Sequence, residues 1–317
     1  MRQVKRFLHK LLRHQHWEVG IVPHPISSFL DPDFAPVVQW MPDREPTLFR
    51  ADPFMLQHQG RQLIVYEDFD YQTRIGRIST SEWTTGAFHS LAQDVLPIDS
   101  HLAYPYTLEY EQRTLCIPES ALENEVAAWE FDDATNRFRK VAVLIPNLRA
   151  VDSSIFRHEG LWWLACTLRR ERPNEQLFLW HANDLFGKWI PHRKNPVKRD
   201  ASSARPGGTP FVHQGELYRP AQDCSQRYGS AVTINRILKL TPDQFAEETV
   251  VRIPPFSESP YPSGIHTLSA AGPVTLVDGL RYEFLPSETL QVFKRGISRM
   301  MPQGNRRSGD LSTNRAP

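Results

Sequence analysis

Two aspartates stand at the same place in two copies of a recurring segment. Asp52 opens DPFMLQHQG and Asp152 opens DSSIFRHEG, and in both copies a glycine follows eight positions later. Two carboxylates that face one pocket can act on a glycosidic bond, because one can attack or activate water while another group protonates the leaving oxygen. An aspartate before a strand can also cap a turn, so a turn-capping role is the alternative for each residue.

The segment recurs with other residues at its opening. Tyr104 and Gly207 open two further copies, and His266 is expected to open a fifth within GIHTLS. Short apolar runs flank the turn of each copy, and two such runs around a tight turn are typical of a β-hairpin. Each of the first four hairpins is followed by a weaker pair of runs that carries a large aromatic residue: Trp83, Phe138, Trp189 and Phe245.

These units predict an all-β fold. Four strands that repeat about every 50 residues are typical of a β-propeller. We therefore expect a five-bladed β-propeller over residues 17–300, in which residues 17–40 supply a closing strand or a strap. A helical repeat does not fit, because no 3.6-residue period is sustained between Gly20 and Phe293.

The two ends of the sequence differ from this pattern. Four aliphatic residues near the start recur at helical spacing opposite a basic face: Val4, Leu8, Leu11 and Leu12. They predict a short amphipathic helix over residues 1–16, which either packs on the propeller or makes weak peripheral contact with an anionic membrane. Residues 301–317 are polar and are expected to be disordered.

The amino-acid composition limits which binding partners and which cellular compartment we expect. The 37 Lys and Arg residues nearly balance the 36 Asp and Glu residues, so we expect no nucleic-acid partner. The three cysteines, Cys116, Cys166 and Cys224, fit neither a disulfide framework nor a zinc site, which favours a reducing, cytoplasmic compartment. The sequence contains no familiar nucleotide or metal motif, so we expect no cofactor and no metal.

The propeller geometry predicts a site at one mouth of the central channel. The first strand of each blade lines the channel, and the hairpin returns the end of the second strand to the same face. Tyrosines there can stack on sugar rings, and arginines can hold a carboxylate or phosphate. The residues expected to contact a ligand are Glu67, Tyr104, Tyr106, Arg205, Arg219, Gln222, Asp223, Tyr228 and His266. For His266 a structural hydrogen bond is the alternative.

The motif ADPF at the first opening, with a second aspartate two blades later, resembles the five-bladed furanosidase-type glycoside hydrolases, the arabinanase, xylosidase and invertase group. The resemblance implies that Asp52 is the base or nucleophile and that Asp152 is a positioning carboxylate. The acid glutamate of that group is expected near the fourth opening, where this sequence has ARPGG. We therefore expect Glu119 to supply the acid from a neighbouring blade. The alternatives for the acid are Glu67 and Asp223.

A second resemblance covers most of the chain. Its motifs are RADPF, YPYTLE with IPES, VDSSIF with GLWWL, NPV, ARPGG, LYRPAQDC with YG, and GIHTLS. Together they are similar to the N-terminal domain of plant glucosamine inositolphosphorylceramide transferases, and similar propellers occur in bacteria beside sugar formyltransferase-like domains. In the plant proteins a separate C-terminal module resembles a glycosyltransferase. The resemblance therefore does not by itself carry transferase activity over to this sequence.

Two functions from different classes follow. The first is a carbohydrate-active propeller, similar to glycoside hydrolases, that acts on a sugar or glycan during assembly or trimming of a surface glycan. The alternative is a non-catalytic module that binds a glycan or nucleotide-sugar and partners a separate glycosyltransferase or formyltransferase. A purely structural interaction propeller is a third interpretation, so the sequence leaves open whether the protein is an enzyme.

Overall fold

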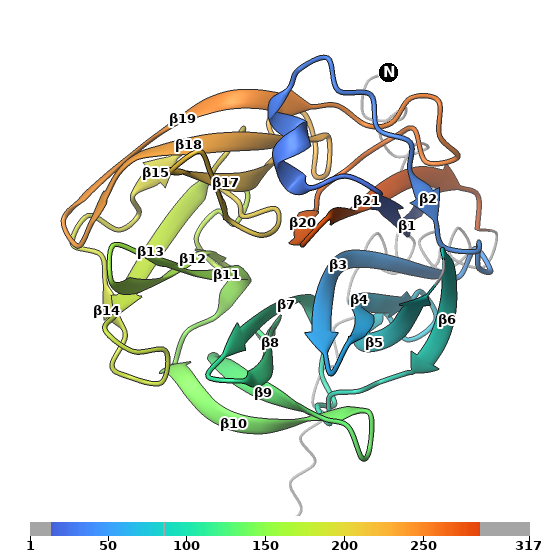
Figure 1. The fold of residues 1–317 in the computed structure, drawn as a ribbon, viewed down its shortest axis with the longest axis horizontal. Helices are drawn as coiled ribbons and strands as arrows, with labels where there is room; N and C mark the ends of the chain where they lie inside the picture. The colour runs from blue at the N-terminus through green and yellow to red at the C-terminus, as the bar shows by residue number, and fades with distance from the viewer. Residues whose placement is uncertain (1–13, 85, 286–317) are drawn as a thin grey trace, which may run out of the picture. The chain divides into compact units, whose positions relative to one another are not determined.

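Five antiparallel β-sheets surround a common hub (Figure 1). The computed structural model describes residues 14–84 and 86–285. The chain divides into a unit of residues 15–282, which holds nearly all of the five sheets, and a unit of residues 1–14 and 283–317, which falls almost entirely outside the described residues. The disorder expected for residues 301–317, and most of the helix expected over residues 1–16, therefore fall on residues that are not described.

The first four blades are antiparallel meanders in which strand order in space follows strand order in the sequence. Blade 1 consists of β3 (Leu48–His58), β4 (Arg61–Asp70), β5 (Ile75–Thr84) and β6 (Ala87–Ala92). Blade 2 consists of β7 (Ala103–Tyr110), β8 (Arg113–Glu119), β9 (Glu125–Asp132) and β10 (Arg137–Pro146). The strands β3 and β7 lie nearest the hub, as the propeller prediction requires (Figure 1).

Blades 3 and 4 repeat this arrangement. Blade 3 consists of β11 (Ala150–His158), β12 (Leu161–Leu168), β13 (Gln176–Ala182) and β14 (Ile190–Pro191), and β15 (Lys198–Arg199) also pairs with β13. Blade 4 consists of β16 (Phe211–His213), β17 (Glu216–Asp223), β18 (Ala231–Thr241) and β19 (Gln244–Ile253).

The fifth blade is closed by the N-terminal part of the described chain. Its sheet has the order β2-β1-β21-β20, with β20 (Leu268–Ala271), β21 (Val274–Glu283), β1 (His14–Val22) and β2 (Gln39–Trp40). A 3-10 helix, η1 (Ile26–Leu30), lies between β1 and β2. The five-bladed propeller and its closing strand are thus confirmed.

The helix prediction is wrong for residues 14–16, which belong to β1. Pairing of β1 with β21 satisfies the backbone of this strand and buries Trp17, Val19 and Ile21 in the closed blade. The gain from closing the sheet outweighs the local helical pattern.

A bulge stands at the opening of each of the first three blades. The last regular pairs before the bulges are Ala51↔Glu67, Ala103↔Glu119 and Val151↔Thr167. The opening residues that follow have positive φ, of 51° at Asp52, 43° at Tyr104 and 53° at Asp152. A bulge turns its side chain away from the regular alternation, and the strained backbone persists because the blade packing on both sides determines it.

The last two blades keep the same opening position. In blade 4 an isolated bridge between Pro206 and Ala221 replaces the regular pair, so Gly207 is the equivalent opening residue. In blade 5 the pair Leu268↔Val277 places His266 two residues earlier, as Asp52 stands two residues before Phe54. The predicted equivalence of the five openings is a feature of the fold.

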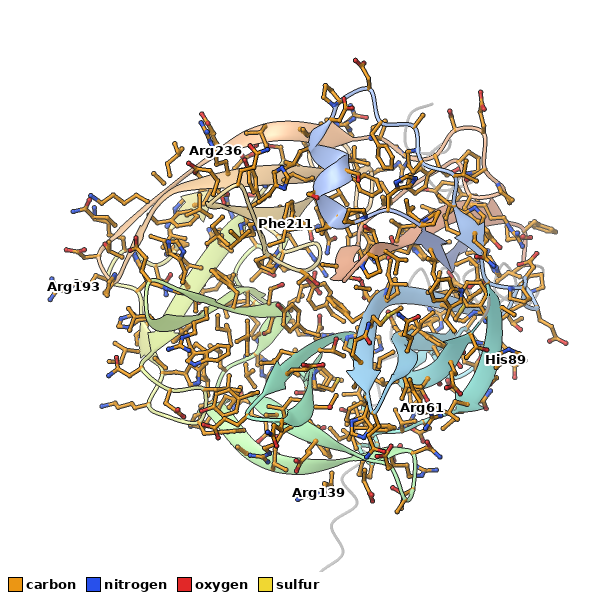
Figure 2. All side chains as sticks on the ribbon, viewed as in Figure 1. Arg61, His89, Arg139, Arg193, Phe211 and Arg236 are labelled. Atoms are coloured by element: carbon orange, nitrogen blue, oxygen red, sulfur yellow. The ribbon has the colours of Figure 1, made fainter. Side chains whose placement is uncertain are left out.

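Apolar side chains pack between neighbouring blades. One cluster joins Phe54 of blade 1 to Tyr104 of blade 2 and Leu164 of blade 3. Charged side chains at the rim, such as Arg139 and Arg193, point away from the hub (Figure 2). In residues 14–84 and 86–285 we find no helix with the length and apolar character that crossing a bilayer requires.

Candidate functional site

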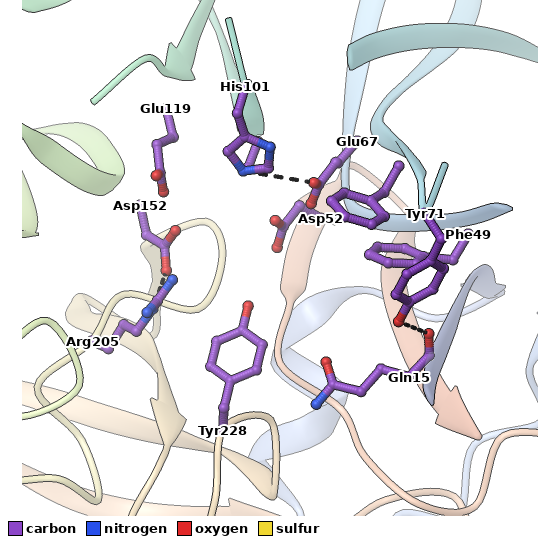
Figure 3. Close-up of a pocket in the computed structure, with 12 residues that line it drawn as sticks. Gln15, Phe49, Asp52, Glu67, Tyr71, His101, Glu119, Asp152, Arg205 and Tyr228 are labelled. Atoms are coloured by element: carbon purple, nitrogen blue, oxygen red, sulfur yellow. Dashed lines mark hydrogen bonds and ion pairs between the residues drawn. The ribbon is translucent and has the colours of Figure 1, made fainter. Parts of the chain in front are cut away.

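An acidic cavity of about 300 Å³ lies near the hub (Figure 3). The residues that line it are Gln15, Phe49, Asp52, Glu67, Phe69, Tyr71, His101, Ala103, Glu119, Asp152, Arg205 and Tyr228. Four of them carry carboxyl groups, and these come from β3, β4, β8 and β11. Blades 1, 2 and 3 therefore each contribute acid to one site.

Asp152 is held by two donors on the far side of the cavity from blade 1. Its Oδ2 accepts a hydrogen bond from Nε of Arg205 at 2.5 Å and another from Nε2 of Gln222 at 2.7 Å. Arg205 in turn donates to Asn174 at 2.9 Å, and its guanidinium lies 5.0 Å from the centre of the Tyr228 ring. The charge-assisted contact with Arg205 fixes the position of Asp152.

Glu119 lies beside Asp152 and is protonated at neutral pH. The pKa of Glu119 is raised to about 8. Burial is the largest cause, and the neighbouring charge of Asp152 together with a hydrogen bond with it raises the pKa more than Arg205 lowers it. The protonated carboxyl is the donor in that hydrogen bond. Glu119 is therefore a proton donor held against a fixed carboxylate.

Asp52 sits in a different environment. Its Oδ1 accepts a hydrogen bond from the hydroxyl of Thr267 at 2.7 Å and lies 3.3 Å from Nε2 of His266. Burial raises the pKa of Asp52 to about 6; His266 opposes that rise, and Asp152 and Asp278 add to it. Asp52 thus changes charge close to neutral pH.

His266 bridges Asp52 to a buried carboxylate behind it. Its Nδ1 lies 2.8 Å from Asp278, whose other oxygen accepts the backbone N–H groups of His266 at 2.9 Å and Thr267 at 3.1 Å. Burial alone lowers the pKa of His266, but Asp278 and Asp52 outweigh it, so the pKa is raised. The ring of Trp17, from β1, packs against His266 with 4.1 Å between ring centroids. The closing strand therefore also supports the site.

Glu67 is the fourth carboxyl group of the cavity. Burial raises its pKa well above the ordinary value, with further contributions from Asp52 and Glu119. Its Oε1 lies 3.9 Å from Nε2 of His101, whose Nδ1 accepts the N–H of Gly76 at 2.9 Å. Burial and the nearby Arg169 lower the pKa of His101, so the ring is neutral with its proton on Nε2, toward Glu67.

Aromatic rings form one wall of the cavity. Phe49 and Phe69 stack with 4.6 Å between their centroids, and Tyr71 packs on both rings. Tyr228 lies across the cavity from this wall (Figure 3). A small pocket with aromatic faces and convergent polar groups suits a single sugar ring.

The structure brings part of the predicted set together. The predicted residues that line the cavity are Asp52, Glu67, Glu119, Asp152, Arg205 and Tyr228. Gln222 and His266 do not line it but touch the carboxylates that do. The catalytic and binding roles of these residues stay predictions.

Four other predicted contacts lie away from the cavity. The hydroxyl of Tyr104 accepts the Gly208 N–H at 2.7 Å, and that of Tyr106 donates to the carbonyl of Ile155 at 2.6 Å. Both tyrosine side chains are buried. They join blades, and the cavity wall does not include them.

Arg219 and Asp223 also have structural partners. Arg219 is 1% exposed and donates to Glu247 at 2.6 Å, and Asp223 accepts from Arg252 at 2.8 Å. Arg219 and Asp223 stand two residues on either side of Ala221, the blade 4 equivalent of Glu67, so strand alternation places them on the same face as that position. Their ion pairs, Arg219 with Glu247 and Asp223 with Arg252, distinguish them from Glu67.

Several cavity residues were not predicted from the sequence: Gln15, Phe49, Phe69, Tyr71, His101 and Ala103. Phe49 and His101 stand three residues before Asp52 and Tyr104, the openings of blades 1 and 2. This shared offset of three residues could have been used to predict from the sequence that both residues lie at the cavity. Gln15 and Tyr71 carried no such signal, because they reach the cavity from the closing strand and from a hairpin turn.

Two groups of possible metal ligands occur within the described part of the chain, with their ligand atoms inside 4.8 Å of one another: Asp52 with His266 and Asp278, and His16 with Glu18 and Asp43. In the first group the histidine already lies between the two carboxylates. A metal ion bound there would have to displace the proton of His266 and break the ion pairs of His266 with Asp52 and Asp278. The donor set therefore suits a charged imidazole better than a metal ion.

The fold is similar to that of several solved glycoside hydrolases. A family 117 glycoside hydrolase from Zobellia galactanivorans aligns with a TM-score of 0.51 at 12% identity, over 78% of this chain and 89% of that chain. An exo-β-1,3-galactanase from Clostridium thermocellum aligns with a TM-score of 0.53 at 7% identity, over 68% of this chain and 56% of that chain. A family 43 β-1,3-galactosidase solved with galactodeoxynojirimycin aligns with a TM-score of 0.52 at 9% identity, over 67% of this chain and 81% of that chain. The chain is thus a five-bladed propeller with a glycoside hydrolase-like fold.

Sequence relatives define the family. The model of the family described as "Glucosamine inositolphosphorylceramide transferase 1, N-terminal" matches residues 36–258. The chain belongs to this family. The transferase of that name from Oryza sativa subsp. japonica is 34% identical over 218 residues, and that from Arabidopsis thaliana is 32% identical over 230 residues. These alignments cover 65% and 67% of this chain but only 28% of each relative. Both resemblances drawn from the sequence are confirmed.

Proposed function

We propose that the protein binds one sugar unit of a glycan in the acidic cavity and acts on its glycosidic bond by acid–base chemistry. The observation that carries the proposal is the convergence of Asp52, Glu119 and Asp152 on one cavity in unlike surroundings, which raise the pKa of Asp52 to about 6 and that of Glu119 to about 8. Near pH 7 the first group is ionised and the second is protonated. Two carboxyl groups in opposite protonation states are what glycosidic bond cleavage requires.

Each carboxyl group then has a role. Asp52 is the base or nucleophile, and His266 orients it and limits the rise of its pKa. Glu119 is the acid that protonates the leaving oxygen. Asp152 positions Glu119 and, held by Arg205, keeps it protonated.

The comparisons support a carbohydrate ligand. The solved structures of similar fold are glycoside hydrolases, and the family relatives are named for glucosamine and inositolphosphorylceramide. A role in the assembly or trimming of a surface glycan fits both. The chain spans 28% of each of these relatives, so transfer itself belongs to the proposal only as a reaction of a separate partner.

A second function is favoured by Arg205. It stands at the fourth opening, where the hydrolase resemblance expects an acid, and it neutralises Asp152. A cavity whose carboxylates are partly compensated can bind a sugar through hydrogen bonds without cleaving it. The alternative is therefore a non-catalytic glycan- or nucleotide-sugar-binding module that works beside a separate glycosyltransferase or formyltransferase.

Turnover and binding assays on the same panel separate the two functions. We would measure release of nitrophenol from aryl furanosides and pyranosides, and of sugar from the matching alkyl glycosides, with isothermal titration of the free sugars. Asp52→Asn should lower kcat/KM by about 10²- to 10⁴-fold. Glu119→Gln should have a larger effect on alkyl than on aryl glycosides, because nitrophenol leaves without protonation.

Asp223→Asn is the matched control, since it alters a buried carboxylate that does not line the cavity. Binding without product, weakened by Asp152→Asn, would establish the binding module instead. Undiminished turnover in Asp52→Asn would remove the acid–base mechanism. Neither heat nor product from any sugar of the panel would contradict both functions.

A further inference from the structure

Two arginines face each other at the mouth end of blade 3. The N–H of Arg169 donates to the carbonyl of Arg149 at 3.0 Å, which continues the ladder of Val151↔Thr167 and Ala150↔Leu168. Residues directly opposite in an antiparallel pair point to the same face of the sheet, so the two guanidinium groups share one side. Like charges in that arrangement are destabilising unless something neutralises them.

Neither arginine is among the residues that line the cavity, but the blade repeat places this side toward it. Arg149 and Arg169 occupy the positions that Phe49 and Phe69 occupy in blade 1, where the two rings are paired across the ladder and line the cavity. His101 holds the corresponding position in blade 2 and also lines the cavity. In agreement, Nη1 of Arg169 lies 3.9 Å from Oε1 of Glu119.

Neither arginine side chain donates a hydrogen bond to an acidic side chain within the described residues. Within residues 14–84 and 86–285, the Arg149 side chain makes no hydrogen bond or ion pair, and the approach of Arg169 to Glu119 is too long for a hydrogen bond. Arg205 differs, because Asp152 and Asn174 engage its guanidinium. Arg149 is half-buried and the side chain of Arg169 is 44% exposed, so both can be reached by a ligand.

We propose that Arg149 and Arg169 form a subsite that binds a phosphoryl group carried by the sugar in the cavity. The inference rests on the proposed function, since it takes the cavity as a sugar site. Two guanidinium forks match the oxygens of one phosphate, and a phosphomonoester carries close to two negative charges at neutral pH.

The charge of the cavity also orients such a ligand. The carboxylates of Asp52 and Asp152 repel a phosphate, so the phosphoryl group lies at the rim beside blade 3. The sugar ring then lies against the aromatic wall of Phe49 and Phe69. The two rims of the cavity would then contact different parts of the ligand: blade 1 contacts the apolar face of the sugar ring, and blade 3 contacts the anionic group.

Isothermal titration tests the subsite directly. The probes are inorganic phosphate and glucose 1-phosphate, with glucose as the neutral comparison, on the full chain at low ionic strength. In the double variant Arg149→Gln/Arg169→Gln the affinity for both phosphate probes should fall about tenfold or more, while the affinity for glucose stays the same. Arg157→Gln, an exposed position at the other end of β11, is the matched control and should change nothing.

The source of the phosphoryl group is decided by a second arm. Phosphatidylcholine vesicles with and without phosphatidylinositol are sedimented with the wild type and with the double variant. Retention that requires phosphatidylinositol and both arginines assigns a lipid head group, and binding of the soluble probes alone assigns a soluble sugar phosphate. Either result supports the subsite.

Equal phosphate affinity in the wild type and the double variant, or no phosphate binding to the wild type, overturns the proposal. Asp52→Asn distinguishes this failure from failure of the proposed function. That variant should lose turnover and keep phosphate binding. Turnover of neutral glycosides without phosphate binding would leave the function standing and remove only the subsite.

Discussion

Asp52 and Asp152 adopt the same left-handed backbone conformation, with φ of 51° and 53°, at the same position of blades 1 and 3. Both line one cavity, yet their partners differ. Asp152 is bound by Arg205 and Gln222, whereas Asp52 meets Thr267 and His266. One repeated backbone position thus places two carboxylates in unlike electrostatic surroundings, which is how a symmetric scaffold yields an asymmetric site.

The pH dependence of turnover should be bell-shaped. Asp52 must be ionised, and its pKa is about 6, while Glu119 must be protonated, and its pKa is about 8. The value of kcat/KM should therefore be highest near pH 7 and fall on both sides. His266→Gln removes a cation that lowers the pKa of Asp52, so it should move the acidic limb to higher pH. An acidic limb that stays in place in His266→Gln would contradict this assignment.

Stability should fall as the pH rises from about 4.5 to 8. Glu119 and Glu67 have pKa values raised by burial, so the folded state holds protons that the unfolded chain releases near pH 4.5. Their contribution is complete below that pH and is lost as the pH rises through the folded pKa. We expect the free energy of unfolding, measured by urea denaturation, to drop by about 1 kcal/mol per pH unit for Glu119, and Glu67 should act in the same direction. Glu119→Gln should flatten the dependence, and a steady rise of stability with pH would contradict it.

Tyr104→Phe should destabilise the protein rather than change ligand affinity. The variant removes a hydroxyl that accepts the Gly208 N–H at 2.7 Å and bonds Ser154 at 2.9 Å, so a buried donor loses its partner. The expected loss in the free energy of unfolding is about 1–3 kcal/mol. Tyr110→Phe, whose hydroxyl contacts Asp184 at the surface, is the control and should cost about 0.5 kcal/mol or less. A loss of sugar binding in folded Tyr104→Phe, without a change in stability, would restore its predicted ligand contact.

Gly76→Ala should disturb the cavity by displacing residues that line it. An added Cβ would lie 2.3 Å from Oε1 of Glu67 and 2.4 Å from the carbonyl of Leu102, so Glu67 and the His101 loop must move. Overpacking of this kind typically costs about 1–3 kcal/mol, and we expect a matching loss of ligand binding by titration. In Gly60→Ala no atom lies within 4 Å of the added Cβ. The only cost is backbone strain, because alanine rarely adopts the φ of 81° found at this position. This variant should therefore lose some stability and keep full binding, and equal binding in both variants would contradict the prediction.

The repeat in the sequence was sufficient to predict the blades and their openings. Hairpin turns and alternating apolar runs are local signals, since they record how a strand pairs with its neighbour in the chain. Asp52, Asp152 and His266 therefore could be recognised as equivalent before any coordinates. The closing strand could be anticipated as well, because a ring of blades leaves one edge unpaired.

Which polar side chains reach the cavity depended on contacts between blades. Both Arg205 and Arg219 belong to the blade 4 region of the sequence, but Arg205 pairs with Asp152 of the neighbouring blade 3, whereas Arg219 pairs with Glu247 of its own blade. Burial and neighbouring charge also set the pKa values of Asp52 and Glu119, and both arise only when distant segments meet. The sequence by itself determined the scaffold through local pairing, whereas the tertiary structure alone decided the chemistry of the site, because charge and desolvation act between residues that the chain keeps far apart.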